Sequence, residues 1–195
     1  MKTALFLLLA TAAFAADAPL LKDDFSAPKL ETRRASRGEW KFADHVATCT
    51  QDDELYKKFK DHGPIIFYDL AYTDAAIRFA FKPDETTKSV VFTSNGDDGH
   101  IFRIVFSKAG ASIRAFPPEG KADHTSIAAG TEPDLKLKPG EWTNVSVELR
   151  GSKATLKIGD FVKTYDHASF ARAKTNLSVG FAFGTVSVKD IVVEK

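Results

Sequence analysis

The chain has 195 residues, 27 Lys and Arg against 26 Asp and Glu, a formal net charge of +1, and one cysteine. The balanced charge excludes a nucleic-acid binder that relies on a basic excess, and a single cysteine excludes an intrachain disulfide or a thiolate zinc cluster. A domain of this length buries about 70% of its unfolded surface, so its core needs no covalent cross-link.

The first 15 residues have the features of a secretory signal peptide. Lys2 supplies a short positive start, Ala4–Phe14 is uncharged and mostly apolar, and Ala13-Phe14-Ala15 matches a small-residue cleavage signal. This apolar run is too short to span a membrane, and no other stretch approaches the necessary length. We therefore expect cleavage after Ala15, a domain over 16–195, and an exported soluble protein, periplasmic or extracellular.

Alternation of apolar and polar residues dominates the rest of the chain. Ile77, Phe79 and Phe81 fall on one face of a strand, and Arg78 and Lys82 fall on the other. The expected strands in chain order are Glu39–Ala43, His45–Thr50, Ile65–Tyr72, Ala76–Lys82, Ser89–Ser94, His100–Ser107, Ser112–Phe116, Trp142–Leu149, Ala154–Ile158, Asn176–Phe183 and Thr185–Glu194, the last bulged near Lys189-Asp190. Cys49 lies in one of them, which predicts a buried small hydrophobe rather than a reactive thiol.

Turn-forming residues separate these strands. Asn95–Gly99, Lys108–Gly110 and Gly151–Lys153 each supply the glycine that hairpin turns favour. Asp52–Lys60 is the one stretch with helical character, and we expect it to be a surface loop; Pro117–Gly140 is expected to be a second long irregular stretch. The pattern predicts an all-β, two-sheet antiparallel β-sandwich in a single domain.

Four segments carry a resemblance to known families. Leu137–Val145 has a leucine, glycine and tryptophan approach to a strand, and Ala154–Asp160 continues it with an aliphatic strand and Gly-Asp. With Asp23–Ser26 and Val188–Val193 as paired terminal strands, the chain resembles laminin G-like jelly rolls of the concanavalin A-like class. It is also similar to the exported bacterial 3-keto-disaccharide hydrolase domain family, although the Phe-Asn-Gly-Lys-Asp-Leu opening common there is absent. The resemblance implies a jelly roll, a fold that hosts lectins, hydrolases and inert spacers alike.

Arg103 is the most informative polar residue. It lies in His100–Phe106 between Ile101 and Val105, and the opposite face of this strand is apolar too, which predicts a central strand covered on both sides. A guanidinium there must be paired or must line a groove. It either contacts a sugar hydroxyl or carboxylate on the concave sheet, or forms a structural ion pair with a neighbour such as Glu148.

Other candidate residues complete two possible sites. Arg78 and Glu148 occupy outward faces of their strands and would form a polar row with Arg103 if all three shared one sheet; each alone also suits a solvated face. His62 and His100 adjoin glycines at the mouths of strands, where a histidine serves as an acid/base or as an ordinary surface residue.

Trp142 either stacks on a sugar ring or anchors the start of its strand. The turn Asn95–Asp98 carries oxygen ligands that suit Ca²⁺, but hairpin chemistry explains every residue in it. No histidine pair has metal-ligand spacing, so we predict no metal and no cofactor. The acidic Glu-x-Asp-x-x-Glu arrangement of laminarinase-like glycosidases is also missing, which disfavours a retaining hydrolase of that type.

Three functions therefore remain open from the sequence. The first is an exported module that binds a carbohydrate or cell-envelope glycan on its concave sheet through Arg78, Arg103 and Trp142, with Glu148 in the same polar row. The second is a hydrolase resembling the 3-keto-disaccharide hydrolases, with His62, His100 or Glu148 as acid/base. The third is a non-catalytic envelope or matrix interaction module.

Overall fold

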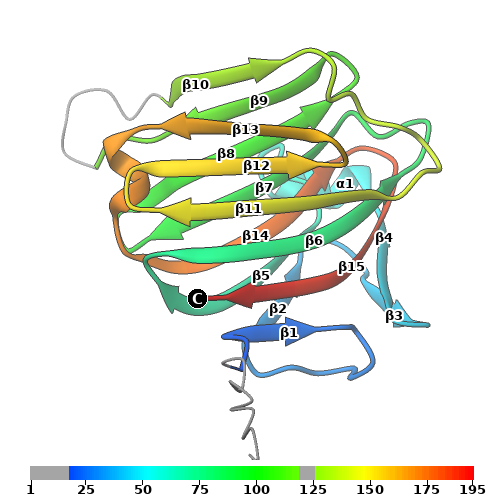
Figure 1. The fold of residues 1–195 in the computed structure, drawn as a ribbon. Helices are drawn as coiled ribbons and strands as arrows, with labels where there is room; N and C mark the ends of the chain where they lie inside the picture. Colours follow the sequence, from blue (N-terminus) through cyan, green and yellow to red (C-terminus); the bar gives the residue numbers. More distant parts are fainter. Residues whose placement is uncertain (1–17, 119–125) are drawn as a thin grey trace, which may run out of the picture.

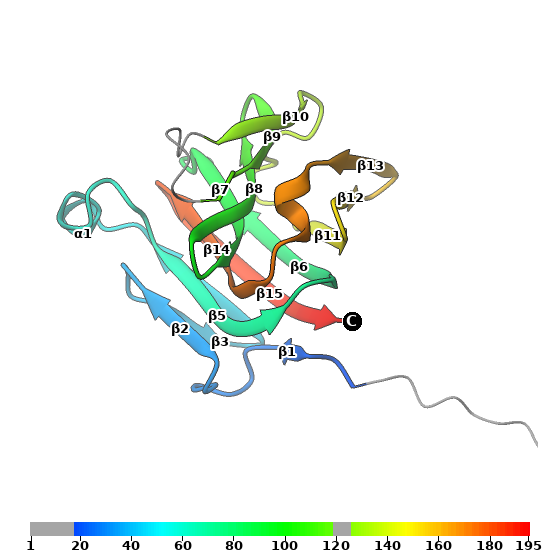
Figure 2. The same cartoon turned by 90° about the vertical axis from the view of Figure 1, so that its left-hand side faces the viewer.

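The computed structural model describes residues 18–118 and 126–195, so the predicted signal peptide 1–15 lies outside the described residues. Two antiparallel sheets face each other as a jelly-roll β-sandwich, which confirms the predicted fold class (Figures 1 and 2). None of the described helices is long and apolar enough to cross a membrane.

The eight-stranded sheet runs in the order β13 (Phe161–Asp166), β12 (Lys153–Ile158), β11 (Thr143–Arg150), β6 (Ala75–Pro83), β15 (Thr185–Glu194), β4 (Val46–Thr50) and β3 (Lys41–Ala43), with β1 (Leu21–Asp23) also paired to β15. The seven-stranded sheet runs in the order β10 (Ile127–Glu132), β9 (Gly110–Ala115), β8 (Gly99–Ser107), β7 (Ser89–Gly96), β14 (Lys174–Ala182), β5 (Ile65–Tyr72) and β2 (Arg33–Ser36).

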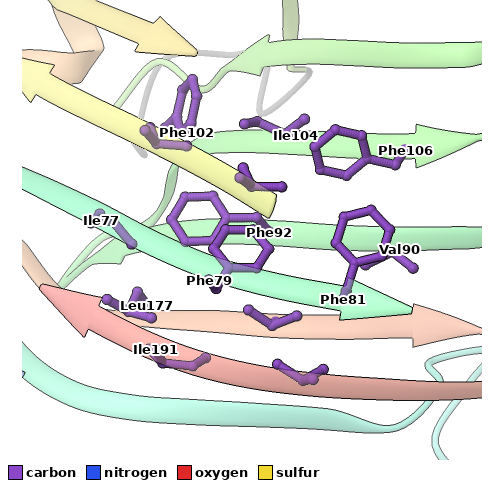
Figure 3. Close-up of a cluster of buried hydrophobic side chains, with 14 of the residues drawn as sticks. Ile77, Phe79, Phe81, Val90, Phe92, Phe102, Ile104, Phe106, Leu177 and Ile191 are labelled. Atoms are coloured by element: carbon purple, nitrogen blue, oxygen red, sulfur yellow. The ribbon is translucent and has the colours of Figure 1, made fainter. Parts of the chain in front are cut away.

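Aromatic side chains from the two sheets meet in the core. The ring of Phe79 on β6 stacks on that of Phe92 on β7, with centroids 5.3 Å apart, and Phe81 lies 5.2 Å from Phe106 on β8 (Figure 3). The alternation read in the sequence therefore fills the space between the sheets. Cys49 is 2% exposed, as predicted, and burial raises the pKa of its thiol to about 11.

Three edge or near-edge strands and one helix differ from the prediction. β2 and β13 were not expected, and β10 lies inside the stretch expected to be irregular. β10 lacks large alternating side chains; its backbone pairing to β9 defines it, and it is bulged between Ala128 and Gly130. The stretch expected as a loop at Asp52–Lys60 contains α1 (Asp53–Lys58), because the Asp52 side chain caps it by accepting a 2.8 Å bond from the Leu55 N–H. A short 3₁₀ helix, η1, covers Ala168–Ala171.

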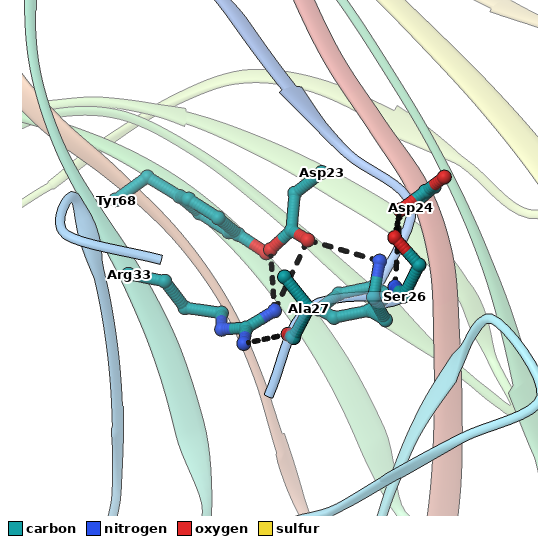
Figure 4. A network of polar contacts seen from close by, with 7 residues as sticks. Asp23, Asp24, Ser26, Ala27, Arg33 and Tyr68 are labelled. Atoms are coloured by element: carbon teal, nitrogen blue, oxygen red, sulfur yellow. Dashed lines mark hydrogen bonds and ion pairs between the residues drawn. The ribbon is translucent and has the colours of Figure 1, made fainter. Parts of the chain in front are cut away.

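Buried polar contacts join the two sheets at one edge of the sandwich. Asp23 on β1 accepts bonds from Arg33 on β2 at 2.9 and 3.0 Å and from the Tyr68 hydroxyl on β5 at 2.8 Å (Figure 4). The Arg33 and Asp23 side chains are 3% and 4% exposed. At the other edge, Glu132 on β10 accepts a bond from the Tyr165 hydroxyl on β13 at 2.9 Å. These contacts tie the two sheets together at both edges of the sandwich.

Candidate functional site

A row of side chains crosses the outer face of the seven-stranded sheet. Strand register pairs Arg114 with Arg103, Arg103 with Thr93, Thr93 with Ser178, and Ser178 with Phe67. Directly paired residues of neighbouring strands share one face, so these five side chains form one line across β9, β8, β7, β14 and β5. Their sequence neighbours, such as Ile104, Phe92 and Val179, point into the core.

A groove of about 500 Å³ lies over most of this row. Its polar residues include Thr93, Asn95, Ser178 and Arg103. Its apolar residues include Ile65, Phe67 and Val91, and the segment after α1 adds Asp61, His62 and Gly63 to its lining. The groove thus combines hydrogen-bonding groups with an apolar surface, as ligand sites commonly do.

A β-bulge brings His100 onto the same face as Arg103. Strict alternation would place residues three apart on opposite faces, but the pairing of β7 with β8 shifts between Ser94 and Asn95, so that Asn95 pairs with His100 and Ser94 with Phe102. The extra residue is Ile101, which is fully buried. His100 and Arg103 can therefore interact directly.

The hydrogen bonds of His100 define its tautomer. The Arg103 Nη2 group donates to Nε2 of His100 at 2.7 Å, and because a guanidinium has no acceptor, this nitrogen must be unprotonated. The other ring nitrogen, Nδ1, then donates to Oδ1 of Asn95 at 2.5 Å, and Asn95 Nδ2 donates to Oδ1 of Asn176 at 2.7 Å. Arg103 Nε donates to the Thr93 hydroxyl at 3.2 Å. The result is a continuous polar network with a neutral imidazole.

The electrostatics agree with this network. Burial, the Arg103 charge and His62 together lower the pKa of His100 to about 4. Desolvation and the neighbouring Arg114 charge also lower the pKa of Arg103, although it remains a cation at neutral pH. The two arginines therefore repel each other across β8 and β9.

His62 lies at the rim of the same groove. Its Nδ1 is 3.0 Å from the carbonyl oxygen of Phe59 and 2.8 Å from that of Lys60. Carbonyl oxygens only accept, so Nδ1 carries the proton and Nε2 is the basic nitrogen. The structure thus brings together three of the predicted site residues: His62, His100 and Arg103.

Arg78 and Glu148 lie on the eight-stranded sheet, and Trp142 directly precedes its strand β11, so Arg78 and Glu148 do not form the expected polar row with Arg103. Arg78 on β6 forms a two-point ion pair with Glu194 at 2.6 and 2.9 Å. Glu148 on β11 lies 3.3 Å from Arg150, not beside Arg103. Both pairs are well exposed. The alternation of residues correctly predicted that these side chains point outward, but it could not show that β6 and β8 belong to different sheets.

Trp142 also lies away from the groove, at the start of β11. The amino groups of Lys189 and Lys82 lie 4.7 and 5.2 Å from its ring centroid. It lines a separate hollow with Leu135 and Ile158. It therefore cannot stack on a sugar held at Arg103.

The turn after β7 forms a hairpin, as predicted. Asn95 is engaged with His100 and Asn176, and Asp98 pairs with Arg172. Among residues 18–118 and 126–195 there is no cluster of three His, Cys, Asp or Glu side chains suited to a metal ion.

Sequence reasoning missed several groove residues, namely Phe67, Thr93, Asn95 and Ser178. The sequence carried a signal for Thr93 and Asn95, because they share the alternating face of Ser89 and Val91 and so lie opposite the core-facing Val90 and Phe92. Nothing local showed that these positions would lie beside those of β14 and β5.

Comparisons with known proteins define the fold only. No family model and no curated protein matches the chain. Among solved structures, it is similar to the carbohydrate binding module CBM66 from Bacillus subtilis, with a TM-score of 0.62, 9% identity, and coverage of 84% of this chain and 96% of that one. It is also similar to the Bacillus licheniformis β-glucanase, with a TM-score of 0.67, 7% identity, and coverage of 91% and 99%. The CBM2 module of the Lactobacillus casei BL23 phage J-1 evolved Dit gives a TM-score of 0.60, 8% identity, and coverage of 90% and 94%.

Proposed function

We propose that this protein is a glycan-binding module and that the groove on the seven-stranded sheet holds the sugar. The observation that carries the proposal is the groove itself, in which the donors and acceptors of Arg103, Thr93 and Asn95 lie beside the apolar Phe67 and Val91. Sugars present hydroxyl groups for hydrogen bonding and apolar C–H faces for packing on aromatic rings. The carbohydrate-binding modules and the β-glucanase among the similar structures support this choice.

Calorimetric titration after a glycan-array screen tests the proposal. We expect binding at millimolar oligosaccharide or below, and about ten-fold weaker binding by Phe67→Ala, because one stacking aromatic is lost from the groove. Trp142→Ala is the matched control, since it removes an aromatic ring from the opposite sheet. Thermal unfolding of each variant separates lost binding from lost structure.

Two results would contradict the proposal. Loss of binding in Trp142→Ala but not in Phe67→Ala would move the site to the eight-stranded sheet. No binding to any oligosaccharide, together with destabilisation by Arg103→Ala, would instead favour the non-catalytic interaction module.

A hydrolase resembling the 3-keto-disaccharide hydrolases is the second candidate function, favoured by the presence of two histidines at one groove. His62 is the better acid/base, because both ring nitrogens of His100 are engaged by Arg103 and Asn95. Glu148 lies on the opposite sheet and does not join this pair. Incubation with oxidised disaccharides tests the activity: we expect cleavage that is lost in His62→Gln, and unchanged substrate rejects this function.

We also propose that the protein is exported and meets its glycan in the periplasm or outside the cell. The support is the signal-peptide pattern ending at Ala15. Mass spectrometry of the protein recovered after expression of residues 1–195 checks this, and a mature chain that begins at Ala16 is expected.

A further inference from the structure

We infer that the groove selects an acidic glycan, one that carries carboxylate or sulfate groups; this inference rests on the proposed function and specifies its ligand class. The observation behind it is a pair of arginines, Arg103 and Arg114, held side by side on the outer face of the seven-stranded sheet.

Like charges directly opposite each other on neighbouring strands destabilise a sheet. Here the repulsion is large enough to lower the pKa of Arg103 further than burial does alone. Within residues 18–118 and 126–195, no carboxylate pairs with either arginine. An anion seated between the two guanidinium groups would relieve the repulsion.

The partners that hold the arginines in place are neutral. Arg103 is fixed by the Thr93 hydroxyl and the unprotonated His100 nitrogen, and Arg114 by the side chain and carbonyl oxygen of Ser126. These contacts orient both guanidinium groups without cancelling their charge. In the described chain, no protein acceptor meets Nη1 of Arg103, so this group has donors to offer a ligand.

Arg103 lines the groove and Arg114 lies beside it on β9, and the groove's other lining residues have the same charge bias. Arg37 lines its wall, and Asp61 is the one acidic residue in its described lining. Elsewhere on this face the contrast is clear, because Arg34 is neutralised by Asp69 at 2.6 and 2.7 Å. An arginine fork matches the two oxygens of a carboxylate, and charge-assisted bonds of this kind are stronger than neutral ones.

The test uses one polymer in two charge states. Polygalacturonate and its fully methyl-esterified form share a backbone, but only the first is anionic; dextran sulfate and dextran form the corresponding sulfate pair. We expect the purified protein to bind at least one anionic member at least ten-fold more tightly than its neutral partner. This preference should fall as the salt concentration rises, because ions screen the charges. The stronger pair identifies carboxylate or sulfate as the recognised group.

Variants show whether the arginine pair causes the preference. Arg103→Gln and Arg114→Gln should each weaken binding of the anionic polymer about ten-fold or more while leaving the neutral one nearly unchanged. Arg78→Gln is the control, because it removes the same charge from the opposite sheet. Both arginines are only partly buried, and the Arg114→Gln variant keeps the test valid if Arg103→Gln unfolds.

Each remaining outcome has one meaning. Equal binding of charged and neutral polymers overturns the acidic-glycan inference and leaves the proposed function intact. Equal weakening by Arg78→Gln also overturns it, because the attraction would then come from overall charge. Failure to bind any polymer or oligosaccharide removes both proposals.

Discussion

His100 shows how a single side chain depends on its partners. An unperturbed histidine titrates near pH 6.5, but His100, although part of its surface is exposed, packs its ring at 5.1 Å from that of Phe116 and accepts a bond from a guanidinium. Protonation at Nε2 would break this bond and place a third positive charge beside Arg103 and Arg114. The neutral imidazole is therefore part of what orients Arg103 toward the groove.

This environment predicts the titration of His100. We expect NMR titration of its ring protons to give a pKa of about 4, and Arg103→Gln to raise that pKa toward the ordinary value. As the pH falls, His100 takes up its proton in the unfolded chain before it does so in the folded protein. The free energy of unfolding therefore decreases between about pH 6.5 and pH 4, and His100 causes no further decrease below pH 4. A pKa near 6.5 that ignores the Arg103 substitution would contradict the network.

At the level of elements, one buried polar cluster ties β1 to the opposite sheet. The backbone of β1 pairs with β15, and the Asp23 carboxylate accepts bonds from Arg33 and Tyr68 of the seven-stranded sheet. The Arg33 guanidinium also lies 4.2 Å from the centre of the Phe42 ring. The cluster therefore closes one edge of the sandwich.

Asp23→Asn should reduce the free energy of unfolding by about 3–5 kcal/mol, because it leaves Arg33 buried without a counter-charge. Urea denaturation measures the change. Asp24→Asn is the control: this neighbouring carboxylate is 46% exposed, and its loss should reduce the free energy of unfolding far less than loss of Asp23 does. An equal decrease in the free energy of unfolding in both variants would show that the buried ion pair stabilises the fold no more than an exposed carboxylate does.

At the scale of the whole molecule, one core joins both sheets, which predicts one cooperative unfolding transition. The two tryptophans report on different regions, since Trp40 packs edge-on against Phe181 of the seven-stranded sheet and Trp142 lies at the start of β11. We expect fluorescence from Trp40→Phe and from Trp142→Phe each to give the same midpoint as far-ultraviolet circular dichroism of that variant. Separated midpoints would mean that the sheets unfold independently.

The sequence by itself determined the class of fold, most strands, the hairpin turns and the burial of Cys49. These features depend on neighbouring residues: period-2 alternation assigns the two faces of a strand, and glycine-containing turns mark its ends. The predicted bulge near Lys189-Asp190 is present for the same reason, with Asp190 at φ +55°.

The candidate site was decided by tertiary structure. Alternation placed Arg78, Arg103 and Glu148 on outward faces, but strand order, which is set by long-range pairing, put Arg103 on one sheet and the other two on the opposite one. A bulge at Ile101, which the alternation of residues in the sequence does not reveal, turned His100 toward Arg103. Pairing between β8 and β9 placed Arg114 beside Arg103, because register is fixed by the whole sheet and not by either strand alone.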